Sequence, residues 1–239
     1  RVAFIISELI FLFLSWGFRN TKNKFVLKIE SLVVNHKHET ILLLLIFVYF
    51  FYFTTASFLR YDNFYTGRFD LGNMDQTVWN TINGRIFQLT DPNGTDIISR
   101  LAFHADFILI LISPLYWIWS SPKMLLLLQT LIVSFGAIFI FLISSDILKK
   151  KNISFIFSLI FLLNPALQYS NLYDFHPVVL ATTFLLATFY FLIKKRYSLF
   201  LLFLLLSVLT KEDVWIIAAL FGLYILFFLK RKIFGFLIF

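Results

Sequence analysis

The chain has 239 residues, of which 60% are hydrophobic, 20% are aromatic and only 14% are charged, and its formal net charge is +8. A soluble domain of this length needs more charged side chains to cover its surface, so the composition is typical of a membrane protein. The absence of cysteine excludes a disulfide framework and a thiolate site. Because the chain starts at Arg1 and stops within an apolar segment, we expect residues 1–239 to be a single transmembrane domain and a piece of a longer polypeptide.

Seven apolar segments are candidates for helices in or on a membrane. They cover residues 2–18, 41–59, 108–120, 124–148, 153–170, 177–193 and 198–229. As a single helix, the last segment would extend about 48 Å, against an apolar bilayer core of about 30 Å, so we predict a helical hairpin that turns at the sequence TKED. The segment 108–120 is too short to span and carries Trp117 and Trp119, so we predict that it lies on or dips into the outer leaflet.

Lysine and arginine residues gather in four short clusters between these segments. The clusters are residues 19–37, 149–151, 194–196 and 230–232, and together they hold 14 of the 21 basic residues. The positive-inside rule places all four in the cytoplasm, so the net charge indicates orientation and not a nucleic-acid partner. Residues 60–123 then form a large first extracytoplasmic loop, and nine of the 13 carboxylates fall on that outer side.

The sequence FDLGNMDQTVWN, residues 69–80, carries the first candidate site in that loop. We predict that Asn73 caps a short helix that ends before Gly84, and that its apolar side rests on the membrane. That apolar side consists of Met74, Val78, Trp79 and Ile82. Asp70, Asp75 and Gln76 would then lie at the bilayer surface. An equally weighted alternative is that Asp75 only complements the helix dipole and Asp70 only makes an Asx turn.

Three more polar motifs fall on the same predicted side: FHADF, YDFHP and TKED. Their candidate substrate-binding residues are His104, Asp174, His176, Lys211, Glu212 and Asp213, and Gln76 joins them from the first motif. We expect these side chains to meet at one outer mouth, where they could bind a cation, a phosphate or a hydroxyl group. Hydrogen bonding at helix ends and a tight polar turn are the structural alternatives. A divalent cation is a possible cofactor, with no ligand set assigned.

The ordered set of motifs resembles an uncharacterised prokaryotic family of polytopic membrane proteins over roughly residues 60–215. That family is similar to the GT-C glycosyltransferases, which usually take sugar from a polyprenyl-phosphate carrier on the outer face of the membrane. In that fold the first large outer loop contains helices along the membrane and an acidic residue near its start. Asp70 best matches this residue, and Asp75 is second. The sequence departs from the commoner adjacent acidic pair, since Leu71 follows Asp70.

We therefore predict an all-α, polytopic transmembrane helix bundle with a GT-C-like fold in a prokaryotic plasma membrane. The predicted function is transfer of a sugar from a lipid-linked donor, with Asp70 and Asp75 as the catalytic residues. The main alternative is an ion- or proton-coupled transporter or flippase, in which carboxylates and histidines bind the coupling ion. A scaffold protein without catalytic activity is the third possibility.

Overall fold

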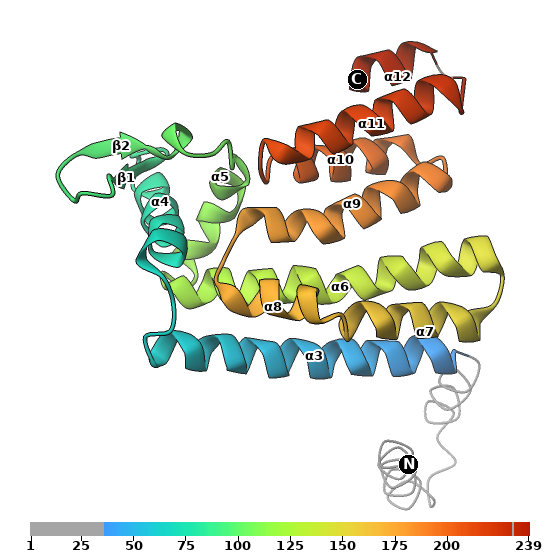
Figure 1. The fold of residues 1–239 in the computed structure, drawn as a ribbon, viewed down its shortest axis with the longest axis horizontal. Helices are drawn as coiled ribbons and strands as arrows, with labels where there is room; N and C mark the ends of the chain where they lie inside the picture. Colours follow the sequence, from blue (N-terminus) through green and yellow to red (C-terminus); the bar gives the residue numbers. More distant parts are fainter. Residues whose placement is uncertain (1–35, 231) are drawn as a thin grey trace, which may run out of the picture. The chain divides into compact units, whose positions relative to one another are not determined.

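The computed structural model describes residues 36–230 and 232–239 (Figure 1). The predicted segment 2–18 and nearly all of the first basic cluster lie outside the described residues. The chain divides into two compact units, residues 1–43 and 44–239. The second unit contains every candidate site residue.

Two described helices are long and apolar enough to cross a membrane, namely α3 (Lys37–Asp62) and α6 (Pro122–Leu148). A third candidate span is the pair α7 (Lys151–Leu162) and α8 (Pro165–Tyr173), which bends by 42° between its two helices. The bend occurs where Asn164 caps α8 by accepting hydrogen bonds from the next turn, and Pro165 then takes the first helical position. The apolar segments 41–59, 124–148 and 153–170 are thus helical, and the last of them is broken.

Two further apolar segments, 177–193 and 198–229, form the shorter helices α9 (Pro177–Ile193), α10 (Tyr197–Val208) and α11 (Asp213–Phe227). The last helix, α12 (Lys232–Ile238), lies beyond the predicted segments. The hairpin predicted for residues 198–229 is present as α10 and α11, which turn at residues 209–212. Gly222 of α11 lies against α12 so closely that an added Cβ would be 2.5 Å from the backbone nitrogen of Phe239. Small residues at such contacts let helix backbones approach each other, as is usual between membrane helices.

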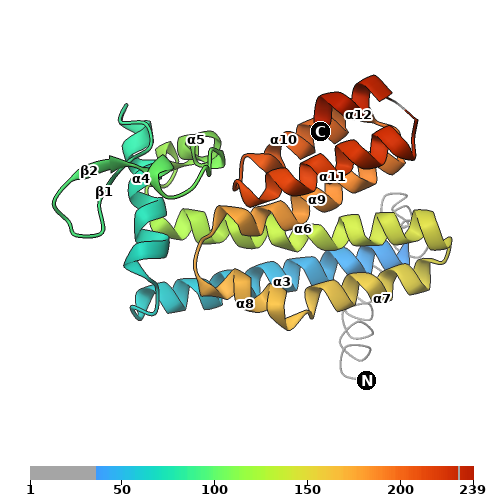
Figure 2. The same cartoon turned by 45° about the horizontal axis from the view of Figure 1, so that its top comes forward.

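Figures 1 and 2 show α6, α7, α9, α10 and α11 alongside one another. The loops that follow α6, α9 and α11 lie at one end of this bundle, and the turn between α10 and α11 lies at the other. Each of these three loops contains a lysine in the left-handed conformation: Lys149, Lys195 and Lys230, with φ of 56°, 55° and 53°. The loops are the predicted basic clusters, so the bundle separates a basic end from an end that carries the polar motifs.

Residues 63–121 fold at the end of the bundle that carries the polar motifs (Figure 2). A π-helical turn (Arg68–Gly72) leads directly into α4 (Asn73–Ile82), and α5 (Ile108–Ile112) continues as a 3-10 helix over Ser113–Trp117. Between them lies an antiparallel hairpin of β1 (Gln88–Thr90) and β2 (Ile97–Ser99), so the fold is nearly, but not entirely, α-helical.

Two predictions for α4 are wrong. Asn73 does not cap the helix, because the π-helical turn runs into α4 without a break and the Asn73 amide donates to the Phe69 carbonyl at 2.8 Å. The side of the helix predicted to rest on the membrane is instead buried in protein: Met74 and Val78 pack in one core cluster with α5, whereas Trp79 is 44% exposed. The predicted helix end is confirmed at Gly84, whose φ is +80°.

Candidate functional site

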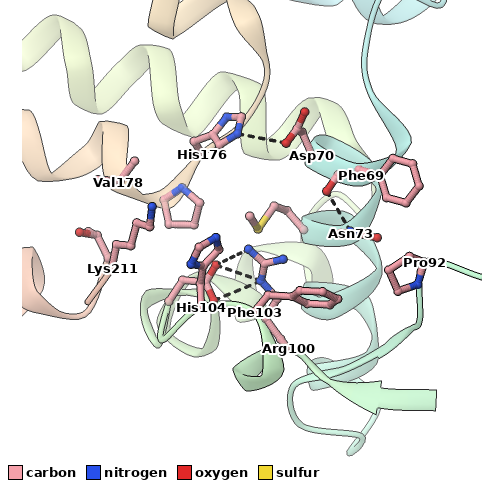
Figure 3. Close-up of a pocket in the computed structure, with 14 residues that line it drawn as sticks. Phe69, Asp70, Asn73, Pro92, Arg100, Phe103, His104, His176, Val178 and Lys211 are labelled. Atoms are coloured by element: carbon pink, nitrogen blue, oxygen red, sulfur yellow. Dashed lines mark hydrogen bonds and ion pairs between the residues drawn. The ribbon is translucent and has the colours of Figure 1, made fainter. Parts of the chain in front are cut away.

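A cavity of about 240 Å³ lies at the end of the bundle opposite the basic loops (Figure 3). It is lined by residues from the π-helical turn and α4, the segment before α5, the start of α9 and the turn between α10 and α11. Its polar lining residues are Asp70, Asn73, Arg100, His104, Asp106, His176, Thr210 and Lys211. Motifs that lie more than 100 residues apart in the chain therefore meet in one cavity.

The YDFHP motif forms one wall of the site because the chain between α8 and α9 is extended. Asp174 and His176 have φ of −170° and −132°. Side chains alternate in an extended chain, so Phe175 points into the core, where it is fully buried, and its two neighbours point the other way. There Asp174 Oδ2 accepts a hydrogen bond from Gly67 N at 2.7 Å, and His176 Nε2 lies 3.3 Å from Asp70 Oδ1.

Gln129 of α6 holds this extended segment in place. Its side chain is fully buried and follows a run of four leucines in the helix. The amide oxygen accepts from His176 N at 2.9 Å, and the amide nitrogen donates to the carbonyls of Asp174 at 2.9 Å and Asn171 at 3.2 Å. We did not predict this residue from the sequence. The available signal was a lone amide in an apolar helix, which must find hydrogen-bond partners inside the protein.

His104 and Glu212 form a second histidine–carboxylate pair beside the cavity. Glu212 Oε1 lies 2.8 Å from His104 Nδ1, and Oε2 accepts from Ala105 N at 2.9 Å. Burial opposes ionisation of Glu212, but the hydrogen bonds from Ala105 and His104 outweigh it and lower the pKa of Glu212 to about 2. An ionised carboxylate only accepts hydrogen bonds, so His104 carries its proton on Nδ1 and can present Nε2 to the cavity.

Arg100 and Asp106 form a buried pair in the same wall as His104 (Figure 3). Arg100 Nε lies 3.0 Å and its Nη2 lies 2.8 Å from Asp106 Oδ2, and the two residues are 4% and 2% exposed. Arg100 lines the cavity, but its positive charge is paired with this carboxylate and is not free for an anionic ligand. Lys211 also lines the cavity, and its Nζ lies 3.0 Å from Asp213 Oδ2.

Comparison with known proteins supports the membrane setting. The family model described as "Predicted membrane protein (DUF2079)" matches residues 60–239. The chain belongs to this family. No curated protein and no solved structure matches it. The matched region starts at the end of α3 and includes every residue that lines the cavity, so the whole candidate site belongs to the DUF2079 part of the chain.

Five of the nine predicted site residues of this DUF2079 protein do not line the cavity, and three of these, Asp75, Gln76 and Asp213, lie away from it. Asp75 accepts a hydrogen bond from the Tyr116 hydroxyl at 2.5 Å, and burial raises the pKa of its carboxyl group, with that hydrogen bond opposing the rise. Gln76 exchanges two hydrogen bonds with Thr90 and so joins α4 to β1. Asp213 extends into solvent, with 70% of its side chain exposed.

The other predicted residues of the DUF2079 protein come together. Asp70, His104, His176 and Lys211 line the cavity, and Asp174 and Glu212 stand directly behind two of them. Within residues 36–230 and 232–239, no group of three or more histidine, aspartate or glutamate side chains is placed to hold a metal ion. The arrangement is suited to proton transfer at two histidine–carboxylate pairs.

Proposed function

We propose that this membrane protein transfers a sugar from a polyprenyl-phosphate carrier to an acceptor hydroxyl, and that the reaction takes place in the cavity beside Asp70. The observation that carries the proposal is the 3.3 Å contact between Asp70 Oδ1 and His176 Nε2 in the cavity wall. A carboxylate held by a histidine and partly open to a cavity is the arrangement expected of a general base. About a third of each side chain is exposed, so a substrate can reach them.

In the proposed reaction Asp70 accepts the proton of the acceptor hydroxyl. The acceptor oxygen then forms a bond to the anomeric carbon of the sugar, while the bond from that carbon to the carrier phosphate breaks and the phosphate leaves with the electron pair. His176 orients the carboxylate of Asp70. Lys211 is the cation in the wall that can face the leaving phosphate, although Asp213 partly neutralises it.

The position of the cavity supports an extracytoplasmic reaction. The basic loops after α6, α9 and α11 lie at the opposite end of the bundle (Figure 1). Under the positive-inside rule, those loops stay in the cytoplasm and the cavity opens on the other face. A lipid-linked donor could then reach the cavity from the outer leaflet.

The direct test is transfer from labelled polyprenyl-phosphate sugars by membranes that contain the protein. We expect Asp70→Asn to abolish transfer and His176→Ala to reduce it at least about tenfold, since general-base catalysis typically contributes at least about a hundredfold. Asp62→Asn is the matched control, because Asp62 pairs with Lys123 at 2.7 Å and does not line the cavity. Equal transfer by wild type and all three variants would overturn the proposal.

Transport is the second candidate function, and the bend between α7 and α8 favours it. Broken membrane helices are common at the substrate sites of transporters. A transporter would move the labelled sugar lipid across a vesicle membrane with its sugar–phosphate bond intact, whereas the proposed transferase breaks that bond. Recovery of intact donor on the opposite side, with no glycosylated acceptor, would therefore favour transport.

A further inference from the structure

Asp174 is a buried carboxylate that the proposed reaction does not use. The residue is 2% exposed, and its Oδ2 accepts one hydrogen bond, from Gly67 N at 2.7 Å. Its other oxygen, Oδ1, is buried and has no hydrogen-bond partner in the described part of the chain. A buried oxygen without a donor is costly for an ionised carboxylate, which needs several hydrogen bonds to replace water.

The carboxylates of Asp174 and Asp70 lie close together around Gly67. A Cβ atom added to Gly67 would be 3.2 Å from Asp174 Oδ2 and 3.3 Å from Asp70 Oδ2. The negative charge of one carboxylate disfavours ionisation of the other, so one of them keeps its proton more easily than an isolated acid. The glycine leaves the space in which both groups fit.

Burial decides which of the two carboxylates keeps the proton. The side chain of Asp70 is 34% exposed, whereas Asp174 is nearly inaccessible. Burial, with a smaller contribution from the negative charge of Asp70, raises the pKa of Asp174. The hydrogen bond from Gly67 and the charges of Arg60 and His176 act in the opposite direction. Arg60 acts on Asp174 through its charge and not by a hydrogen bond, since its guanidinium donates to the carbonyls of Tyr65 and Tyr173.

We infer that Asp174 is a positioning residue which, in its protonated form, holds Gly67 and so sets Asp70 as the charged carboxylate beside His176. The inference rests on the proposed role of Asp70 as the base. The extended segment Asp174–His176 contacts the turn that carries Asp70 at two points, through Gly67 N and through Asp70 itself. Loss of the first contact frees the start of the π-helical turn, and Asp70 then loses its fixed distance from His176.

Two uncharged substitutions at position 174 differ in whether they keep the hydrogen-bond acceptor for Gly67 N. Asp174→Asn keeps the size of the side chain and an oxygen for Gly67 N–H, and it resembles the protonated acid. Asp174→Ala removes the acceptor. We expect hydrogen exchange across residues 67–72 of the purified protein to be unchanged in Asp174→Asn and about tenfold faster in Asp174→Ala, because one buried hydrogen bond is lost. Equally fast exchange in both variants would overturn the inference.

The pH dependence of stability tests the proton on Asp174. An acid whose pKa is raised by folding stabilises the protein fully only below its unfolded pKa of about 3.9, and this stabilisation is lost as the pH rises through the folded value. Wild type should therefore lose melting temperature relative to Asp174→Asn as the pH rises above about 4. Parallel melting curves for the two proteins over pH 4–8 would contradict a protonated Asp174.

These two measurements do not depend on turnover, so the inference and the proposed function can fail separately. In the transfer assay we expect Asp174→Asn to retain most of the activity and Asp174→Ala to lose about tenfold or more, mainly in kcat, because the base is displaced while the cavity remains. Absence of transfer in every protein, with the expected exchange and melting results, would reject the sugar reaction and leave the positioning role intact. Loss of transfer in Asp174→Asn equal to that in Asp70→Asn would reject the positioning role.

Discussion

Glu212 Oε1 lies 2.8 Å from His104 Nδ1, and this contact joins the turn between α10 and α11 to the segment before α5. A second link lies beside it, because Ile108 N donates to the Leu209 carbonyl at 2.7 Å. These two contacts tie together two parts of the cavity lining, which contain His104 and Lys211. The position of the α10–α11 hairpin and the shape of the cavity are therefore coupled.

The Glu212 link predicts a loss of stability in acid. Folding lowers the pKa of Glu212 from its ordinary 4.5 to about 2, so the stabilisation is complete above 4.5 and is lost as the pH falls through about 2. Wild type should lose its melting-temperature advantage over Glu212→Gln between these two values. Melting curves of the purified protein across this range test the prediction, and an advantage that stays constant down to pH 2 would contradict it.

Asp75 and Asp70 should differ in function although they lie only five residues apart. Tyr116→Phe removes the donor that Asp75 contacts at 2.5 Å and should lower the free energy of unfolding by about 1–3 kcal/mol, because a partly buried carboxylate is left without that partner. Asp75→Asn can still accept this hydrogen bond, so we expect it to preserve both the fold and sugar transfer. Melting and transfer assays on both asparagine variants test this, and the reverse pattern, with Asp75→Asn inactive and Asp70→Asn active, would assign the base to Asp75.

The buried pair of Arg100 and Asp106 predicts strong coupling between two substitutions. Removing either partner leaves an uncompensated buried charge and should cost about 3–5 kcal/mol. The double variant Arg100→Met with Asp106→Leu should be more stable than either single variant, since both charges are gone. Unfolding measurements on the four proteins form a double-mutant cycle, and additive losses would show that the pair does not act as a unit.

Hydropathy predicted most of the helices because membrane helices must be long, apolar and internally hydrogen-bonded. The hairpin of α10 and α11 followed from a length that a single span could not accommodate. The π-helical turn before α4 and the small β-hairpin could not be predicted in this way. The π-helical turn is held by the hydrogen bond from Gly67 N to Asp174, and the β-hairpin by the hydrogen bonds between Gln76 and Thr90. Neither set of partners can be recognised from the residues next to each element in the sequence.

The sequence indicated the residues of the cavity better than their pairings. Asp70, His104, His176 and Lys211 were predicted to meet and do line one cavity. The sequence did not indicate that Asp106 neutralises Arg100 or that Gln129 holds the YDFHP segment, because pairing partners are set by packing between helices. The alternation of polar and apolar residues in Asp174–Phe175–His176 does predict the extended segment, since an apolar residue between two polar ones is typical of an extended chain with one buried side.

We propose that the cavity opens on the face of the membrane opposite the basic loops, and the absence of cysteine from the chain allows a direct test by labelling. Val178 lines the cavity near the start of α9, and Lys195 lies in the basic loop just after the same helix. A membrane-impermeant thiol reagent added to intact cells should label Val178→Cys at once and label Lys195→Cys only after the membrane is permeabilised. Labelling of Lys195→Cys alone in intact cells, or of both variants equally, would contradict the account.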